Sequence, residues 1–190
     1  MKSSNPLWKN IIVPTLSLSI LCLVVTFAIV GTHALTAQRI EKQQEIILHQ
    51  SLERLIPATQ YETLYINESE GYTIFLALAD EGTVLGHLFL TSTFGYSSDV
   101  LVLTAIVDET IKAIDVVDAS GETPGLGTKI QEESFTKHFR NLTVPPTLTR
   151  TEPTHEGEIQ AITGATISAD AVVEAVAKAM ELYDTYIAPQ

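Results

Sequence analysis

The hydrophobic and polar positions of this chain change their pattern several times between the two ends. Residues 11–30 are apolar and uncharged, and residues 36–56 repeat their apolar positions with the period of a helix. Residues 62–107 hold short β-rich runs separated by glycines, and residues 168–186 return to a helical period. These patterns predict an apolar helix, an amphipathic helix, a set of strands and a C-terminal helix.

The first apolar stretch has the length of a membrane span. A helix over residues 11–30 rises by 1.5 Å per residue to about 30 Å, which matches a bilayer core. Pro14 lies in the first turn, where proline costs least. A cleaved signal peptide is the alternative, because small residues follow at 31–37, but its apolar core is usually only about 7 to 15 residues long. We expect one transmembrane helix over residues 11–31.

The charges around this span predict its orientation. Lys2 and Lys9 precede it without any acidic residue. The positive-inside rule then places residues 1–10 in the cytoplasm and the rest of the chain outside it. We therefore expect a single-pass protein of the inner (cytoplasmic) membrane with its globular part on the periplasmic side.

An amphipathic segment follows the span. Pro57 ends it, and the pattern predicts an amphipathic stalk helix over residues 32–57 that either continues from the span or packs on the following domain. The apolar face of the segment consists of Ile40, Ile47, Leu48, Leu52, Leu55 and Ile56.

The remaining residues, 58–190, predict one α+β domain of antiparallel strands packed with helices. A tight turn is expected at Asp108-Glu109-Thr110, an amphipathic run at 131–141 and a proline-broken loop around 144–146. The expected strands cover residues 62–66, 72–79, 83–92 and 100–107, with two strands on either side of the turn, and the last helix is expected at 168–186 with an inner stripe of Val172, Val173, Val176, Met180 and Tyr183.

Composition excludes several classes of function. The chain has 23 acidic and 11 basic residues, and a net charge of −12 argues against nucleic-acid binding. Cys22 is the single cysteine, which excludes an intrachain disulfide and a cysteine-ligated zinc or iron–sulfur site within this chain. The five histidines are scattered, so we expect no metal site.

Two short loops carry the candidate chemistry. The first, Gly-Glu-Thr-Pro-Gly-Leu-Gly at 121–127, combines exposed backbone N–H groups with little side-chain bulk, although by composition alone it is an ordinary turn. The second, Thr-Gly-Ala-Thr at 163–166, opens the last helix and leaves the Thr166 hydroxyl unobstructed at an end that favours anions. The simpler interpretation is that Thr166 or Ser168 is a helix N-cap, worth about 1 kcal/mol.

The combination of the two loops is more specific than either loop alone. Glu-Thr-Pro-Gly-Leu-Gly, then Thr-Gly-Ala-Thr at the start of a C-terminal helix, behind one N-terminal span, resembles the FMN-binding domain family. The chain is most similar to the G subunits of Rnf-type (Rsx) electron transport complexes. The C subunit of the sodium-pumping NADH:quinone reductase shares both motifs and is the alternative within the family.

The resemblance implies a covalent flavin. In this family the last threonine of the second motif, here Thr166, carries FMN through a phosphoester bond, which also makes the chain a phosphoprotein. A separate flavin transferase makes the bond from FAD with magnesium, so the chain needs no catalytic base of its own. The other cofactor-binding residues that the resemblance implies are Thr163, Gly164 and Ala165 beside the acceptor, and Glu122, Thr123, Pro124, Gly125, Leu126 and Gly127 in the loop against the flavin.

The chain departs from the family pattern at several positions. Gln160 stands where an aspartate is usual, Ser120-Gly121 where a histidine or lysine commonly precedes the first motif, and Phe135 near a common tryptophan. Ala169 follows Ser168 where the family often has a second hydroxyl pair. None of these positions is the acceptor hydroxyl, so the expectation for Thr166 stands.

The function implied by the resemblance is electron relay. The chain would be a flavoprotein subunit of an ion-translocating ferredoxin:NAD oxidoreductase complex. Its partners would be other membrane subunits, membrane lipid and, during maturation, the flavin transferase that attaches FMN. Without a nicotinamide motif or a cysteine cluster, it should not oxidise NADH alone. A non-redox membrane sensor that binds flavin and a stand-alone flavin reductase are the alternatives from other classes.

Overall fold

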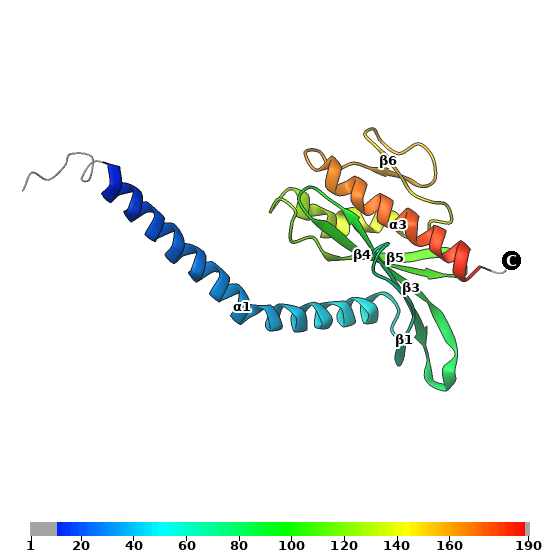
Figure 1. Cartoon of the computed structure of the whole chain (residues 1–190). Helices are drawn as coiled ribbons and strands as arrows, with labels where there is room; N and C mark the ends of the chain where they lie inside the picture. The colour runs from blue at the N-terminus through cyan, green and yellow to red at the C-terminus, as the bar shows by residue number, and fades with distance from the viewer. Residues whose placement is uncertain (1–10, 189–190) are drawn as a thin grey trace, which may run out of the picture. The chain divides into compact units, whose positions relative to one another are not determined.

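A computed structural model describes residues 11–188 (Figure 1). The chain divides into two compact units, one ending at Ile46 and one beginning at Ile47. A single helix, α1 (Val13–Leu55), contributes to both units. The expected cytoplasmic segment 1–10 lies outside the described residues.

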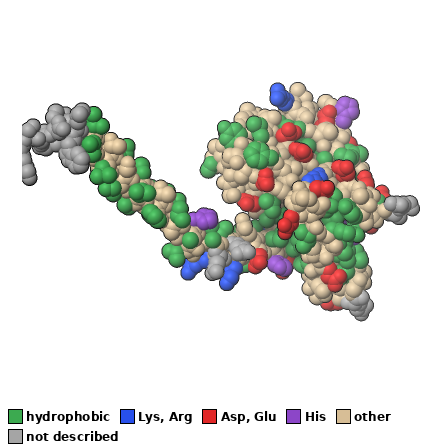
Figure 2. Space-filling view, in the orientation of Figure 1, with side chains coloured by type: hydrophobic (Ala, Val, Ile, Leu, Met, Phe, Trp, Pro, Cys, Tyr) green, Lys and Arg blue, Asp and Glu red, His purple; other side chains and the backbone are tan. Residues whose placement is uncertain are grey.

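The first unit consists of the N-terminal part of α1. Val13–Ala37 is the one segment of the described chain that is long and apolar enough to cross a membrane. Its large side chains are exposed within the chain, with Phe27 at 74%. Figure 2 shows hydrophobic side chains along the surface of this helix. The hydroxyls of Thr15 and Thr26 donate to the carbonyls of Ile11 and Cys22 one turn earlier, which satisfies these polar groups without water. This composition is that of a membrane anchor.

The second unit is built on a five-stranded antiparallel sheet in the order β1-β2-β3-β4-β5. Each strand pairs with the next one along the chain, and the expected turn connects β4 to β5 with Asp108 and Glu109 at φ 49° and 61°. A short 3₁₀ turn, η2 (Asp80–Gly82), connects β2 to β3. The strands are β1 (Gln60–Asn67), β2 (Tyr72–Leu78), β3 (Val84–Phe94), β4 (Asp99–Val107) and β5 (Thr110–Asp118).

The C-terminal helix α3 (Thr166–Tyr186) packs on one face of this sheet (Figure 1). The whole predicted inner stripe, from Val172 to Tyr183, is buried there. Two threonine hydroxyls of β3 bind backbone carbonyls of α3 and so fix the position of the helix on the sheet. Thr93 Oγ1 donates to the Ala171 carbonyl at 2.7 Å, and Thr91 Oγ1 donates to the Ala175 carbonyl at 3.0 Å. The second and third turns of α3 are therefore anchored to the C-terminal part of β3. The α+β fold class is confirmed.

The end of α1 belongs to a second apolar cluster of the sheet. Leu52 and Ile56 are buried in this cluster together with Leu88 and Leu103. The sequence pattern allowed the amphipathic segment either to continue from the span or to pack on the domain. In the structure it continues from the span, and its last turns pack on the domain. The compact unit that contains this cluster begins at Ile47. Ile40 in the predicted apolar face lies outside this contact and is 49% exposed.

The connection from β5 to α3 is more irregular than its sequence suggests. The amphipathic run at 131–141 forms short helical elements rather than one regular helix, and it buries Phe135 and Phe139 side by side, with ring centroids 5.5 Å apart. A two-stranded parallel sheet that the sequence did not indicate follows it. The elements are η3 (Gly127–Gln131), α2 (Glu133–Thr136), η4 (Lys137–Phe139), β6 (Thr147–Thr149) and β7 (Glu158–Gln160).

Candidate functional site

The two loops singled out by sequence meet at one cavity at the start of α3. The cavity has a volume of about 340 Å³. The turn between β3 and β4 completes it, so three segments far apart in sequence form one site. The residues that line it are Tyr96, Thr123, Leu126, Gly127, Gly164, Ala165, Thr166, Ile167 and Ser168.

The Thr-Gly-Ala-Thr segment is a tight turn that depends on its glycine. Gly164 has φ +82°, a left-handed conformation that other residues adopt only with strain. A Cβ at this position would also lie 3.2 Å from Leu126 Cδ1 of the other loop. The turn closes through the Ala165 N–H, which donates to the Ile162 carbonyl at 2.9 Å. Gly164 thus provides both the turn and the close approach of the two loops.

The helix that follows this turn begins without a side-chain cap. Ala165 occupies the N-cap position, and among the described residues no side chain accepts a hydrogen bond from the helix end. The N-cap interpretation for Thr166 or Ser168 is wrong, because both residues already lie inside the first turn. The N–H groups of this first turn have no acceptor within the helix and carry the positive end of its dipole. Thr166 is half-buried, and it lines the cavity at this end.

The Glu-Thr-Pro-Gly-Leu-Gly loop supplies the facing wall. Its turn is held by the Leu126 N–H, which donates to the Thr123 carbonyl at 3.1 Å, and by the Gly125 N–H, which donates to Thr128 Oγ1 at 2.9 Å. Thr123, Leu126 and Gly127 line the cavity, whereas Pro124 and Gly125 are exposed beside it. In the second motif, Thr163 is exposed and lies off the cavity wall.

Glu122 lies behind the wall rather than in it. The side chain is only 3% exposed. Its Oε1 accepts a hydrogen bond from the Tyr96 backbone N–H at 2.7 Å, and its Oε2 accepts one from the Ser168 hydroxyl at 2.5 Å. One carboxylate thereby joins the β3–β4 turn, its own loop and the first turn of α3.

Two glycines make room for this carboxylate. A Cβ on Gly95 would collide with Glu122 Oε1, and one on Gly127 would lie 2.7 Å from Oε2 and 3.0 Å from Ser168 Oγ. Neither Tyr96 nor Ser168 was among the site residues expected from sequence. The Gly95-Tyr96 pair in the turn before β4 was the available signal for Tyr96, whereas nothing local marks Ser168 as the partner of Glu122.

The chemistry of the lining suits a flat organic group that ends in an anion. Tyr96, Leu126 and Ile167 present apolar surface and are 63%, 37% and 55% exposed. The free N–H groups and the Thr166 hydroxyl are polar instead, and they lie at the positive end of a helix dipole, where an anion is favoured. An isoalloxazine ring with a ribityl phosphate has both features, so the residues present fit FMN.

Comparison with known proteins identifies the family. A model of the FMN-binding domain matches residues 95–181, and a model of the RnfG N-terminal region matches residues 1–55. The chain is 30% identical over 196 residues to the G subunit of the Na⁺-translocating ferredoxin:NAD⁺ oxidoreductase complex of Acetobacterium woodii, with 93% of each chain covered. The chain belongs to the family of Rnf-complex G subunits. The FMN-binding match begins at Gly95 and includes every residue that lines the cavity.

Other G subunits are similar over most or part of their length. The G subunit of the proton-translocating ferredoxin:NAD⁺ oxidoreductase complex of Clostridium ljungdahlii is 24% identical over 179 residues, with 94% of each chain covered. The G subunit of the ion-translocating oxidoreductase complex of Methanosarcina acetivorans is 36% identical over 103 residues, which cover 53% of this chain and 52% of that one.

A solved structure shares the fold. The C subunit of the Na⁺-translocating NADH-quinone reductase from Parabacteroides distasonis superposes with a TM-score of 0.53 at 22% identity, covering 63% of this chain and 64% of that chain. This likeness supports the α+β fold of the FMN-binding domain. The match of residues 1–55 to the RnfG N-terminal region favours the G subunit over the C-subunit alternative.

Proposed function

We propose that this chain is a membrane-anchored flavoprotein subunit that carries FMN covalently on Thr166 and relays electrons within an ion-translocating ferredoxin:NAD⁺ oxidoreductase complex. The observation that carries the proposal is the position of Thr166. Its side chain lines a cavity, between a glycine turn and an uncapped helix end, in a chain that belongs to the Rnf G-subunit family.

Each wall of the cavity has a separate task in this proposal. The first-turn N–H groups of α3 hold the phosphate that joins Thr166 to the flavin. Tyr96, Leu126 and Ile167 hold and shield the ring. The flavin supplies the electron chemistry when it is bound, and the protein supplies its position and electrostatic surroundings.

Attachment of the flavin falls to a second protein. The bond between Thr166 Oγ1 and phosphorus forms as the pyrophosphate bond of FAD breaks, AMP leaves, and a base on the flavin transferase takes the hydroxyl proton. Among the described residues that line the cavity there is no histidine, lysine or carboxylate that could take this proton. This composition supports an acceptor that is modified by a separate enzyme.

Membrane anchoring gives the flavin a fixed location beside its redox partners. Val13–Ala37 has the length and composition of a span. We propose that the N-terminus lies in the cytoplasm, that the FMN-binding domain lies on the periplasmic side of the inner membrane, and that other membrane subunits exchange electrons with it.

The intact mass of the purified chain tests the tether. The wild-type chain, produced with an active flavin transferase, should gain the mass of one FMN minus water and fluoresce in a denaturing gel. Thr166→Val should lose both signals, and the matched Thr163→Val should keep them because Thr163 lies off the cavity wall. A wild-type spectrum that shows only the bare polypeptide would refute the covalent link.

Co-purification tests the role in a complex. A mild-detergent preparation of the tagged full chain should bring with it other membrane subunits that carry iron–sulfur clusters or nicotinamide sites. Recovery of the flavinylated chain alone, from cells that express its neighbouring genes, would instead favour a sensor or a stand-alone flavin reductase.

A further inference from the structure

The cavity at the start of α3 has a buried acidic group behind it, and the described residues that line it include no basic group. Glu122 accepts one hydrogen bond on each oxygen, from the Tyr96 N–H at 2.7 Å and from the Ser168 hydroxyl at 2.5 Å. In both bonds Glu122 is the acceptor, which is the role of a carboxylate. At 3% exposure this negative charge is poorly screened by solvent.

The carboxylate lies beside the positive end of the helix and is bonded to the Ser168 side chain there. Ser168 is in the first turn of α3 and lines the cavity, so Glu122 lies one hydrogen bond from the place where a phosphate would be held. A carboxylate near a helix N-terminus is stabilised by the dipole. The same partial positive charge is therefore not fully available to a second anion.

The described lining of the cavity offers no cation to offset the two anions. Among the described residues that line the cavity, none is lysine, arginine or histidine. The ion pairs found within residues 11–188 join Arg54 to Asp115, Arg140 to Glu133 and His155 to Glu158, and none includes Glu122. Each negative charge on a bound phosphate consequently adds to the repulsion from Glu122.

Phosphate esters differ in the charge they would bring into this cavity. A monoester such as free FMN carries about −1.5 to −2 at pH 7, because its second pKa is about 6. A phosphodiester, the form that results from attachment to Thr166, has no second acidic proton and carries a single negative charge.

We propose that Glu122 makes this cavity discriminate between phosphate esters by charge, so that it disfavours free FMN and accepts the singly charged diester on Thr166. This inference rests on the proposed function and deepens it. The bond to Thr166, rather than reversible affinity, then keeps the flavin in place, and unattached FMN does not compete for the cavity before maturation.

Titration of flavins that differ only in phosphate charge tests the inference. The full chain is purified in detergent as the Thr166→Ala variant, which cannot be tethered and leaves room for a methyl ester. Three ligands are titrated by quenching of flavin fluorescence: riboflavin, FMN and the methyl phosphodiester of FMN. The diester should bind about tenfold more tightly than FMN, a ratio that corresponds to about 1.4 kcal/mol.

Glu122→Gln in the same background separates charge from shape. Glutamine is isosteric, its amide oxygen can accept from the Tyr96 N–H, and its NH₂ group can donate to Ser168 Oγ. The affinity for FMN should rise about tenfold and that for riboflavin should change less than twofold. Glu132→Gln is the matched control, because Glu132 also accepts from a serine, Ser134 at 3.2 Å, but on the exposed surface.

The ligand series on the Thr166→Ala chain alone can overturn the inference, whether or not Glu122→Gln folds. Equal binding of the two esters, including no binding of either, contradicts it. So does an equal gain for FMN and riboflavin in Glu122→Gln, which would indicate a change of shape. The covalent mass test is independent: a chain that acquires FMN yet binds free FMN as well as the diester refutes this inference and leaves the proposed function intact.

Discussion

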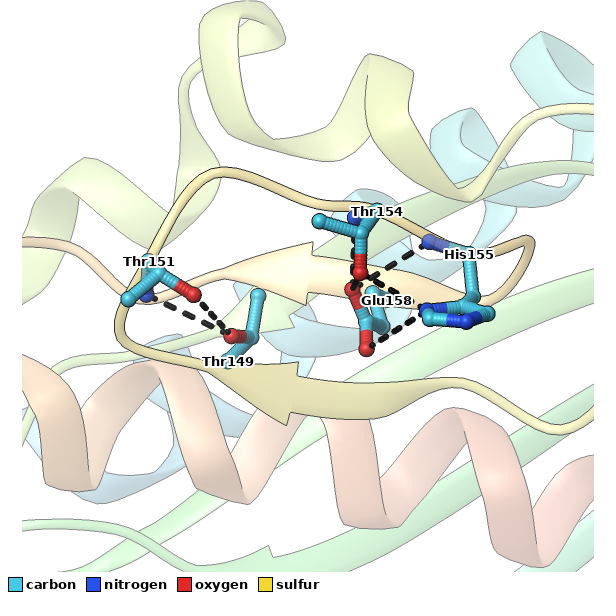
Figure 3. A network of polar contacts seen from close by, with 5 residues as sticks. All are labelled: Thr149, Thr151, Thr154, His155 and Glu158. Atoms are coloured by element: carbon cyan, nitrogen blue, oxygen red, sulfur yellow. Dashed lines mark hydrogen bonds and ion pairs between the residues drawn. The ribbon is translucent and has the colours of Figure 1, made fainter.

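Two glutamates of the FMN-binding domain make the same kind of hydrogen bonds in opposite settings. Glu158, at the start of β7, accepts from the Thr154 N–H at 2.7 Å, the Thr154 hydroxyl at 3.1 Å and the His155 N–H at 3.3 Å (Figure 3). Glu122 also accepts from one backbone N–H and one hydroxyl. Both carboxylates close a loop, but Glu158 does so among largely exposed neighbours and Glu122 does so at 3% exposure.

The sequence distance of the partners is the more instructive difference. The donors to Glu158 lie three and four residues before it, so its network stabilises one local loop. The donors to Glu122 lie 26 residues before it and 46 residues after it, so its network holds three segments of the cavity together. The geometry around Thr166 therefore depends on a long-range contact, whereas the β6–β7 loop depends on its own residues.

Removal of the two carboxylates should separate these roles most strongly. Glu122→Ala leaves the buried Ser168 hydroxyl and the part-buried Tyr96 N–H without their acceptor and opens a void, so we expect a loss of about 3 kcal/mol in the free energy of unfolding. Glu158→Ala should cost far less because water replaces the carboxylate. Urea unfolding of both full-length variants in detergent, followed by circular dichroism, measures the two losses. Equal losses would contradict the distinction between long-range and local networks.

The serine on the other side of this contact should have a smaller effect. Ser168→Ala removes one of the two donors to Glu122 and leaves Glu122 Oε2 buried without a hydrogen bond. This change should lower the free energy of unfolding by about 1 to 2 kcal/mol. The matched change is Ser134→Ala, since Ser134 donates to Glu132 at 3.2 Å on the surface and should contribute almost nothing. The same unfolding measurement compares them. A Ser168→Ala chain as stable as Ser134→Ala would show that the short buried bond contributes little.

The same contrast explains what the sequence could predict. Features with a local signal were predicted well: the apolar span, the turn at Asp108 and Glu109, and the inner stripe of α3, where a 3.6-residue period reports burial directly. The meeting of the two loops followed from a family resemblance, because composition alone makes each an ordinary turn. The partnership of Glu122 with Ser168 has no local pattern, since hydrogen bonds between distant segments leave no periodicity.

Local signals also failed where tertiary packing overrode them. Residues 131–141 have an amphipathic pattern and bury both Phe135 and Phe139, but they form short helical elements rather than one regular helix. Thr166 and Ser168 are good N-cap residues by type. However, Ala165 takes the cap position because the Gly164 turn precedes it directly, and Ser168 is directed to Glu122 instead.

Acid should reveal the smallest of the expected differences, at the exposed network. The Thr154 N–H hydrogen bond, together with the Thr154 hydroxyl, the His155 N–H and the His155 charge, lowers the pKa of Glu158 below its ordinary value, while partial desolvation opposes them. Because the folded pKa is depressed, the network contributes stability above about pH 4.5, and this contribution is lost as the pH falls through the folded pKa. Melting temperatures of the wild-type chain and Glu158→Gln should therefore differ slightly at pH 7 and converge towards pH 3. Glu152→Gln is the control, because it removes the same charge in the same loop but lies outside this network, and it should show no such convergence. Convergence in Glu152→Gln would show that net charge, rather than the hydrogen bonds to Glu158, sets the acid response of this loop.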